Sequence, residues 1–465
     1  ISLTIFFLSI SSLQKINIQK KINLNKLNFF QFFFVLVGFF SLVVLFVLSE
    51  FSNITVFNNS HTTKSLFYKI SGTWGNHEGS LLLWLLILTL SLFLYFLSSK
   101  SRPIKERLLT LIFQEIIIIG FLIFLLKTSN PFDQVFPIPK EGLGLNPILQ
   151  DPILAIHPPV LYLGYVSTSI IFSSSLASLV EGNVNNLWAK HIKKWIFASW
   201  IFLTIGILLG SIWAYYELGW GGFWFWDPVE NISLMPWLSL TALLHCILVL
   251  EKRSLLSSWT IILSISTFTL SVCGTFLVRS GILNSVHTFA NDPERGLFIL
   301  IFLFILVFLS LVIYFLYEKN LKKNNDKFNL FTKESSILIN NWFIMYFLSV
   351  ILIGTIYPIF LEVLSDQKIS VGPPFFNKLL IPFLIPFLIF MSIGPNLNWI
   401  KNKNFANKIQ LAIFFILNLT LSFFIMKMFG KITLTFTILL AASFYLFFIT
   451  FKDLIKKNYK NTSQA

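Results

Sequence analysis

The chain has 465 residues, of which 55% are hydrophobic and only 12% are charged, and its mean hydropathy is +0.78. This composition excludes a soluble domain, in which about a quarter of the residues carry charge. The two cysteines, Cys246 and Cys273, lie in apolar runs, which excludes a disulfide framework, a CxxC redox pair and a zinc site. The net charge of +15 follows a membrane topology, so nucleic acid is not an expected partner.

Apolar runs of about 20 residues recur along the whole chain, and this is the length that a helix needs to cross a bilayer. Because backbone groups in lipid must be paired within their own segment, the sequence predicts an all-α, polytopic transmembrane bundle surrounded by membrane lipid. Ile1–Ser11 is interpreted as the remnant of a further span. The twelve expected spans are 29–49, 80–98, 108–127, 160–180, 195–216, 233–250, 259–278, 297–317, 342–363, 379–396, 409–426 and 433–451.

The basic residues gather in every second connection between these spans. The positive-inside rule places such connections on the inner side of the membrane, and an even number of spans returns both chain ends to that side. The alternate connections are expected to form a cap of loops on the outer face: 51–79, 128–159, 211–237, 279–296 and 365–376. The basic segments, which hold 25 of the 35 lysines and arginines, are 15–26, 100–107, 190–194, 252–253, 319–333, 401–408 and 452–460.

The pattern divides the chain into regions. We expect an N-terminal segment at 1–28, a membrane core at 29–317 that contains the tryptophan-rich stretch 211–237, a basic inner loop at 318–341, C-terminal spans at 342–451 and a basic tail at 452–465.

The stretch 211–237 combines large rings, glycines and carboxylates. Indole prefers the boundary between membrane and water, and glycine allows the backbone to come close to a ligand. We interpret the stretch as a half-buried aromatic platform that stacks on a flat, apolar ligand. An aromatic belt that anchors two helix ends is the alternative. Its tryptophans and carboxylates are Trp213, Trp220, Trp224, Trp226, Trp237, Glu217, Asp227 and Glu230.

Two histidines flank this stretch on the expected outer face. His157 lies just before Pro158-Pro159, where a span is expected to begin, and His287 follows a span. Two imidazoles and an aromatic shelf suit haem, whose iron takes axial nitrogen ligands. Arg279 offers a fork-shaped partner for a haem propionate. Two interfacial histidines that cap helices are the alternative.

His245 lies at lipid depth inside the expected span 233–250. An ionisable residue at such a depth is a candidate functional residue. A buried histidine that bonds to a neighbour is the alternative. If His245 binds haem iron, the sequence offers no partner histidine in a later span, so the second ligand would come from another polypeptide.

The other ionisable residues are interpreted more simply. His61 and His191 are expected to be solvated residues of an outer and an inner loop, whereas His77 has either a structural or a ligand role. Glu115 stands alone in its span, and the chain of intramembrane charges that a proton pump would need is absent from the sequence.

Six further motifs flank the tryptophan-rich stretch: Thr73–Trp84, Asn146–Pro152, His157–Tyr165, Gly274–Gly281, Ser285–Ala290 and Ile369–Asn377. Together with that stretch they resemble the CcmF family, the large haem-lyase subunits of cytochrome c maturation. The tryptophan-rich stretch corresponds to the family's WWD signature, which also occurs in related haem-handling proteins, and the flanking motifs are particular to CcmF. One tryptophan of the usual signature is Phe223 here, and the family's first span is absent or reduced.

The resemblance implies an activity and a set of haem contacts. A haem lyase attaches haem through thioether bonds to the CxxCH motif of apocytochrome c. The resemblance assigns the iron of the incoming haem to His157 and His287, and one ligand of a second, membrane-embedded haem b to His245. The residues expected to contact haem at the outer face are Trp220, Trp224, Trp226, Asp227 and Arg279. No residue of the sequence is an obvious general base.

The resemblance also implies partners and a location. The partners are a CcmE-type haem chaperone, a CcmH-type thiol protein, apocytochrome c and a separate C-terminal CcmF-type chain, because the chain resembles the N-terminal product of a split mitochondrial gene. The expected location is the mitochondrial inner membrane, with the WWD loop facing the intermembrane space, and a bacterial plasma membrane is the alternative. A haem exporter and a non-catalytic scaffold subunit are the competing functions.

Overall fold

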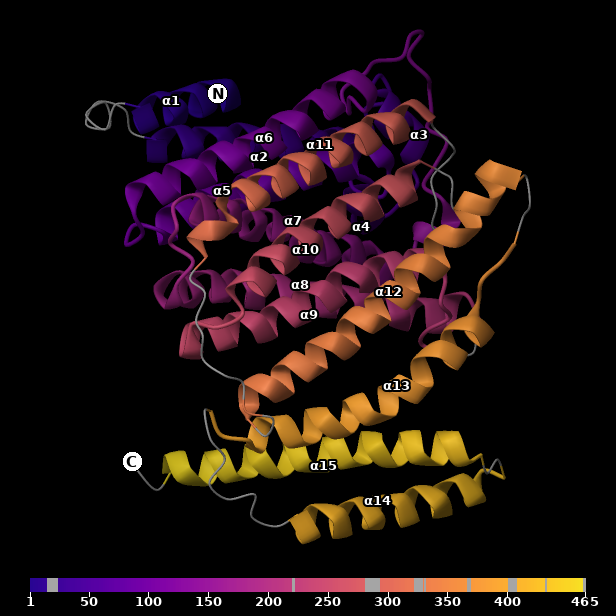
Figure 1. Ribbon diagram of the computed structural model, residues 1–465. Helices are drawn as coiled ribbons and strands as arrows, with labels where there is room; N and C mark the ends of the chain where they lie inside the picture. Colours follow the sequence, from indigo (N-terminus) through magenta and orange to yellow (C-terminus); the bar gives the residue numbers. More distant parts are fainter. Residues whose placement is uncertain are drawn as a thin grey trace. The chain divides into compact units, whose positions relative to one another are not determined.

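The computed structural model describes residues 1–14, 24–219, 222–280, 293–321, 329, 332–365, 369–399, 408–430 and 433–462. Helices joined by loops make up these ranges (Figure 1). The described residues form no β-strand, and an isolated bridge pairs Asn53 with Gln134. The predicted all-α class is therefore confirmed.

A helix occupies each of the twelve expected places. Within the described ranges, eleven helices are long and apolar enough to cross a membrane, and α14 is apolar over the shorter range Ala412–Met428. The twelve are α2 (Leu24–Leu48), α5 (His77–Ser98), α6 (Ile104–Thr128), α7 (Pro152–Val180), α8 (Asn186–Glu217), α9 (Pro228–Arg253), α10 (Ser257–Arg279), α11 (Pro293–Tyr317), α12 (Lys333–Ser365), α13 (Pro373–Ile393), α14 (Lys408–Met428) and α15 (Leu434–Thr462).

Several helices begin earlier than the hydropathy predicted, because polar side chains cap them. Asp151 accepts a hydrogen bond from the Leu154 amide (2.9 Å) at the start of α7, and Asn185 accepts one from the Trp188 amide (3.0 Å) at the start of α8. Proline follows Asp151 directly and is well suited to the first helical position. Hydropathy alone missed these turns, since those of α7 contain His157 and two internal prolines and those of α8 contain three lysines.

The chain forms two compact units, residues 1–323 and 324–465, and the division falls within the expected basic segment 318–341. In the first unit, the central helix is α7, which packs against α5, α6, α8, α10 and α11 (Figure 1). It is the most buried of the eleven candidate spans. The helix α9 covers α8 and α10, while α2 lies on α5, and the short helix α1 (Ser2–Gln14) lies on α6 and α2.

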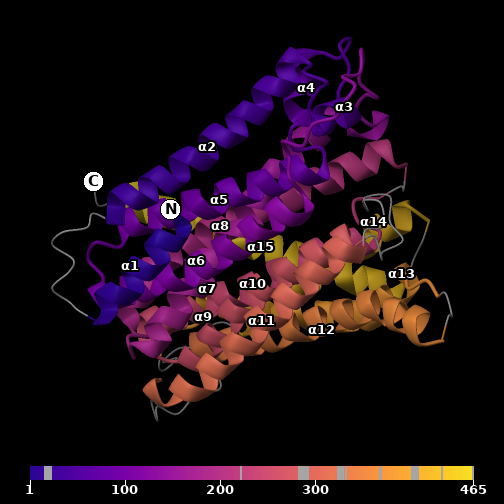
Figure 2. The ribbon, with the colours of Figure 1, turned by 90° about the horizontal axis from the view of Figure 1, so that it is seen from above.

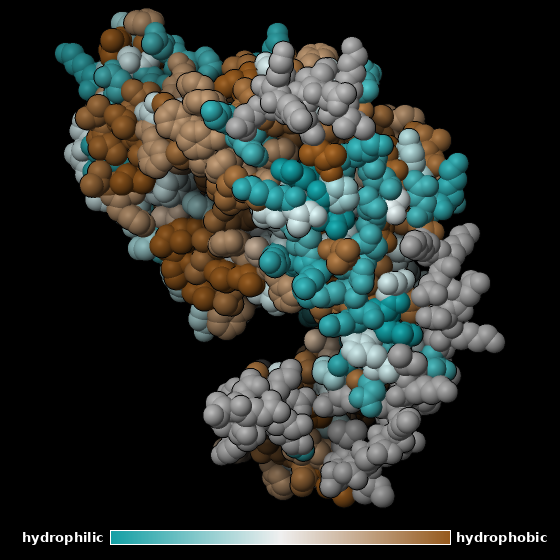
Figure 3. All heavy atoms as spheres, turned by 90° about the vertical axis from the view of Figure 1, so that its left-hand side faces the viewer, coloured by the Kyte–Doolittle hydropathy of each residue, from teal (hydrophilic) through white to brown (hydrophobic). Residues whose placement is uncertain are grey.

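The basic connections of the first unit lie at one end of its bundle. An ion pair between Lys193 and Glu251 joins the start of α8 to the end of α9. The side chain of Asn320, in the 3₁₀ turn η3 (Glu318–Asn320), donates to the Leu179 carbonyl (3.2 Å) at the end of α7. Hydrophilic residues gather on this face (Figure 3). The arrangement agrees with the topology predicted from charge.

Two loops and three short helical turns cover the opposite end. The turns are α3 (Ile54–Asn59), α4 (Leu66–Gly72) and the 3₁₀ turn η2 (Pro147–Leu149). Both the amide and the hydroxyl of Thr62 donate to the Glu141 carboxylate, at 2.9 and 2.6 Å, which joins the loops. These hydrogen bonds hold the pKa of Glu141 below its ordinary value.

In the second unit, α13 packs against α12 and α15, and α14 packs against α15. The Tyr346 hydroxyl of α12 donates to the Leu379 carbonyl of α13 (3.0 Å). The 3₁₀ turn η4 (Gly394–Asn396) ends α13. The expected basic tail 452–465 differs from the structure, because α15 continues through it to Thr462.

Candidate functional site

The motif Thr73–Trp84 contains the turn before α5 and the start of that helix. Hydrogen bonds to its own backbone groups stabilise the turn. Asn76 caps the helix by accepting from the Gly79 amide (2.8 Å), and its side-chain amide donates to the Gly72 carbonyl (2.7 Å). A β-carbon on Gly79 would lie 1.7 Å from the Thr73 carbonyl oxygen, so only glycine fits there. Glycine at position 79 therefore meets a local steric requirement of this turn.

Arg279, the expected partner of a haem propionate, is hydrogen-bonded to this turn. Its side chain is buried, with 3% exposure, and lies in the last turn of α10. The guanidinium donates to the His77 carbonyl (3.1 Å), the His77 Nδ1 (3.2 Å) and the Ser80 hydroxyl (2.9 Å). His77 has the structural role, since its Nε2 lies 3.1 Å from the Ser129 hydroxyl.

A second arginine anchors the chain where α11 begins. Arg295 donates to the Glu78 carboxylate (3.0 Å) and to the Thr128 carbonyl (2.9 Å). Sequence reasoning missed this residue, although an arginine beside an outer helix end is a detectable signal. A β-carbon on Gly296 would lie 2.9 Å from the Ser280 β-carbon, so α10 ends next to the start of α11. His287 belongs to the intervening segment and lies outside the described residues.

His157 lies inside α7, not before it, because the helix starts at Pro152. The imidazole is half-buried against α8, and its Nδ1 lies 2.7 Å from the Gly206 carbonyl oxygen. A carbonyl only accepts, so Nδ1 donates and the neutral ring carries its lone pair on Nε2. Metal-binding histidines show this arrangement, because the second-shell carbonyl fixes the tautomer.

Two prolines inside α7 make this turn unusual. Pro159 has no N–H to donate to the Ala155 carbonyl one turn earlier. The indole N–H of Trp74 donates to that carbonyl instead (2.9 Å). The motif around Trp74 therefore supports the turn of α7 that carries His157, a connection that sequence reasoning did not find.

Much of the stretch 211–237 is helical, so its tryptophans have different roles. Trp213 is 2% exposed and packs with Leu154 in a small core cluster, so it cannot stack on a ligand. Trp237 lies in α9, stacks on Trp200 (6.2 Å between centroids) and donates to the Thr204 hydroxyl (2.8 Å). Both tryptophans pack between helices. The predicted platform is therefore limited to residues of the connection between α8 and α9.

The connection between α8 and α9 carries Phe223, Trp224 and Trp226; Trp220 lies outside the described residues. The rings of Trp224 and Trp226 meet edge to face at 5.9 Å, while the exposed Phe223 stacks on Tyr215 at 4.8 Å. Aromatic faces therefore gather where α8 ends.

The carboxylates of this connection build the start of α9. Asp227 accepts from the Val229 amide (2.9 Å), and Glu230 accepts from the Phe225 amide (2.9 Å) and the Asp227 amide (3.1 Å), which forms a capping box. Trp226 has a positive φ of 58°, a conformation that costs about 1–3 kcal/mol in a non-glycine residue. The capping box holds this strained backbone in place.

His245 lies far from the platform along α9. It follows Pro228 by 17 positions, which corresponds to about 26 Å at 1.5 Å per residue. His157, by contrast, contacts Gly210, which precedes the end of α8 by only about 10 Å. The structure brings His157 and the platform to the same end of the bundle, and it places His245 toward the basic end.

The sequence predicted the surroundings of His61 correctly and those of His191 wrongly. His61 lies in a loop, as predicted, and its Nδ1 is 2.9 Å from the Thr63 hydroxyl. The prediction for His191 is wrong. It lies in α8, half-buried, with its ring 5.4 Å from that of Tyr95, because α8 begins at Asn186.

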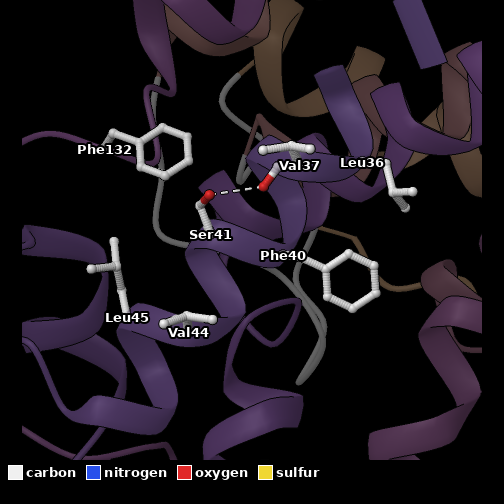
Figure 4. Close-up of a pocket in the computed structure, with 7 residues that line it drawn as sticks. All are labelled: Leu36, Val37, Phe40, Ser41, Val44, Leu45 and Phe132. Atoms are coloured by element: carbon white, nitrogen blue, oxygen red, sulfur yellow. Dashed lines mark hydrogen bonds between the residues drawn. The ribbon is translucent and has the colours of Figure 1, made fainter. Parts of the chain in front are cut away.

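A groove on the surface of α2 is separate from these residues. It lies between one face of α2 and Phe132, and its polar group, the Ser41 hydroxyl, donates to the Val37 carbonyl (2.8 Å) of the same helix (Figure 4). None of the predicted haem contacts lines it, so the candidate site remains the end of the α7–α8 pair with the adjoining aromatic connection.

The chain is similar to known proteins in both sequence and structure. The family model described as "Cytochrome C assembly protein" matches residues 74–283, which include His157, His245 and the aromatic connection. The cytochrome c-type biogenesis protein CycK of Bradyrhizobium diazoefficiens is 50% identical over 79% of the chain and 56% of its own length. The CcmF protein of Escherichia coli is 43% identical over 86% of the chain and 62% of its own length.

A solved structure, titled "Cytochrome c Heme Lyase CcmF", superposes with a TM-score of 0.76 at 26% identity, covering 96% of this chain and 67% of that one. The chain spans just over half the length of the curated relatives that it matches. The 96% of this chain that superposes includes residues of both compact units. The chain therefore belongs to the CcmF/CycK family of cytochrome c-type biogenesis proteins.

Proposed function

We propose that the chain is a haem lyase subunit in cytochrome c biogenesis. It binds haem at the outer membrane face and promotes thioether attachment of that haem to the CxxCH motif of apocytochrome c. The observation that carries the proposal is the 2.7 Å contact between His157 Nδ1 and the Gly206 carbonyl, at the end of the bundle where the aromatic connection lies.

The described residues fit haem as a substrate. With Nδ1 donating, His157 presents Nε2 as an axial nitrogen ligand, and the resemblance assigns the opposite ligand to His287. The indole nitrogen of Trp224 is buried, and no described residue accepts its hydrogen bond. Buried polar atoms rarely lack a partner, so a donor at this position favours an acidic group such as a propionate.

Each part of the site has a task in the proposed reaction. His157 and His287 hold the haem iron, while Trp220, Trp224 and Trp226 cover the faces of the macrocycle. Asp227 keeps the connection in shape by capping α9. The two cysteine thiols of the apocytochrome add across the haem vinyl groups, and each thiol proton passes to a vinyl carbon. Holding the reacting carbon and sulfur atoms in contact supplies the catalysis, because orientation replaces a bimolecular encounter.

A resident haem b near His245 forms the second part of the proposal. His245 is half-buried within α9 and would supply one axial nitrogen, while a later span of the partner chain supplies the other. Such a haem would carry an electron to the substrate haem. The partner chain in this proposal is a separate C-terminal CcmF-type chain.

The proposed partners also include a CcmE-type chaperone, which delivers haem, and a CcmH-type thiol protein, which presents the reduced apocytochrome. The heavy use of Phe, Ile, Asn and Lys supports an organellar coding sequence and hence the mitochondrial inner membrane. The relatives named above come from bacteria, which makes a bacterial plasma membrane the second candidate.

The test is replacement of His157 with Ala in a strain that matures a reporter cytochrome c. We expect loss of holocytochrome c and normal amounts of the membrane protein, and the same result for His287→Ala. His61→Ala is the matched control, because His61 bonds within the cap and lies in a loop. Normal holocytochrome c in His157→Ala would refute the proposal. Haem uptake into vesicles without apocytochrome would favour an exporter, and loss of complex assembly with intact haem binding would favour a scaffold.

A further inference from the structure

The first unit contains a polar seam that the proposed haem chemistry does not use. It lies where α1, α2 and α6 pack together at one edge of the unit (Figure 2). The seam contains Glu115, a fully buried carboxyl at the middle of α6. Eleven residues separate Glu115 from the start of α6, which places it about 16 Å from the basic end of that helix.

Glu115 lies against polar side chains of α1 and α2. The side-chain amide of Gln31, on α2, donates to Glu115 Oε2 (2.9 Å) and to the Ser2 hydroxyl of α1 (2.7 Å). The remaining two acceptor atoms, Glu115 Oε1 and Gln31 Oε1, are buried, and no described residue donates to either. As a carboxylate, Glu115 therefore leaves two acceptors without a donor, and a proton on its carboxyl group would turn one acceptor into a donor.

Further polar atoms without partners continue from this pair toward the basic end. Asn25, Asn28 and Gln31 follow at three-residue spacing, so they lie on one side of α2. Asn28 is 1% exposed, and no described residue bonds to its side-chain nitrogen or oxygen. The Asn25 side-chain oxygen and the Ser9 hydroxyl of α1 are also buried, and no described residue bonds to either.

Buried polar groups without protein partners are typically satisfied by water, which bonds to two to four of them at once. The atoms of this seam are both donors and acceptors, as bridging water requires. Their number and their order along α2 distinguish the seam from a single packing defect. They begin at Asn25, in the first turn of α2, beside the basic segment 15–26.

We propose that the α1–α2–α6 seam holds a file of water that gives Glu115 proton access from the basic side of the membrane. Glu115 takes one proton from this water and becomes a carboxylic acid at the centre of the bilayer. No electron is transferred, and release returns the proton to the same file. The ligand of the site is thus a proton, carried by water from the side that carries the basic loops.

The other charged side chains near the seam lie toward the basic end of the bundle, so Glu115 is the acidic group of the seam. On α6, Glu106 is paired with Arg102 (2.6 Å) near the basic end. Across α6, Gln114 bonds to Ser169 and Ser173 of α7 and is uncharged (2.9 Å each). The other charged side chains at the basic ends of α2 and α6 are Lys26, Lys105 and Arg107.

The protonation state is tested by infrared difference spectroscopy of the full chain in lipid vesicles. We expect a carbonyl band of a protonated carboxyl group at neutral pH that shifts in D₂O and is lost in Glu115→Gln. The Gln31→Leu variant should shift the band, because it removes the amide partner. Glu141→Gln, in the exposed cap, should leave it unchanged. Absence of the band in the wild type would overturn the proposal, and so would a band that does not exchange in D₂O.

Access is tested separately with cysteines in a Cys246→Ala, Cys273→Ala background. Asn28→Cys and Ser9→Cys should react with a small, membrane-impermeant thiol reagent added to the basic side, and not with reagent added to the opposite side. Phe34→Cys is the matched control, because Phe34 lies on α2 and is 57% exposed to the bilayer region. Equal reaction at Asn28→Cys and Phe34→Cys, or reaction only from the opposite side, would contradict the proposed access.

Discussion

At the scale of single residues, the position of His157 depends on the absence of a side chain opposite it. A β-carbon on Gly210 would lie 2.7 Å from His157 Cε1, closer than carbon atoms approach without displacement. Gly206, one turn earlier, provides the carbonyl that bonds to His157. The two glycines of α8 therefore place the imidazole and fix its tautomer, and a close approach of this kind is a common use of small residues between membrane helices.

We expect Gly210→Ala to weaken haem retention by about tenfold or more, as second-shell changes do at metal sites. Alanine favours a helix over glycine, so α8 should persist, and the displaced group is the imidazole ring. The measurement is the absorption spectrum and haem content of the purified protein. If the effect passes through His157, adding Gly210→Ala to His157→Ala should change nothing further. Gly38→Ala, with open space around its β-carbon, is the control.

At the scale of elements, the connection between α8 and α9 is short and tightly capped. Asp227 accepts a hydrogen bond from the Val229 amide, and Glu230 accepts hydrogen bonds from the Phe225 and Asp227 amides. The side-chain amide of Asn231 adds a bond to the Trp226 carbonyl (3.2 Å). These bonds hold Trp226 in its left-handed conformation, so the aromatic rings are set by the start of α9.

The capping role of Asp227 predicts different results for two substitutions. Asp227→Ala removes the acceptor for the Val229 amide and should destabilise the chain by about 1 kcal/mol, as loss of an N-cap does. Asp227→Asn keeps an acceptor and should retain both stability and haem. The measurements are the thermal unfolding midpoint in detergent and the haem content. Loss of haem with unchanged stability in Asp227→Asn would show instead that the carboxylate itself contacts haem.

At the scale of the whole molecule, the two proposed haem positions lie at different depths. His157 is near the end of α7 that adjoins the aromatic connection, whereas His245 is about 26 Å along α9 from that connection. Both belong to the first compact unit, and the family model covers both. In the proposed function, this chain supplies His157 and His287 to the substrate haem and His245 to the membrane haem.

We expect a reduced-minus-oxidised spectrum of the chain with its C-terminal CcmF-type partner to show a b-type haem that is lost in His245→Ala. The same variant should keep the haem that depends on His157, since the two residues are separated along the bundle. His191→Ala, a half-buried histidine of α8, is the control. A b-type signal that survives His245→Ala would remove the membrane haem from the proposal.

The sequence predicted the helices better than the site, for physical reasons. A run of about twenty apolar residues can pair its backbone groups in a membrane by forming a helix. A helix accordingly lies at every expected span. Hydropathy misplaced the starts, although Asp151-Pro152 and Asp227-Pro228 are recognisable helix-start signals. That misplacement put His191 in a loop and His157 before its helix.

Within the site, composition could not separate rings that pack from rings that remain available. Trp213 and Trp224 lie in the same stretch, and only packing distinguishes the core residue from the loop residue. The burial of Arg279 depends on His77 and Ser80, which are about 200 residues away in the chain, so no local pattern could have revealed it. His157 was singled out because it lies on the expected outer face and beside the tryptophan-rich stretch in the sequence, and its role as a haem ligand stays a prediction.

At the neighbouring ends of α10 and α11, the spacing of the two helices does not depend on the length of the segment that connects them. Arg279 and Arg295 fasten these ends, and Ser280 lies against Gly296. The spacing of the two helices is therefore independent of how many residues connect them, and doubling the length of a connection costs only about 0.6 kcal/mol of closure entropy. The reach of the segment that carries His287 can thus drift through insertions and deletions during evolution while the membrane bundle keeps its packing.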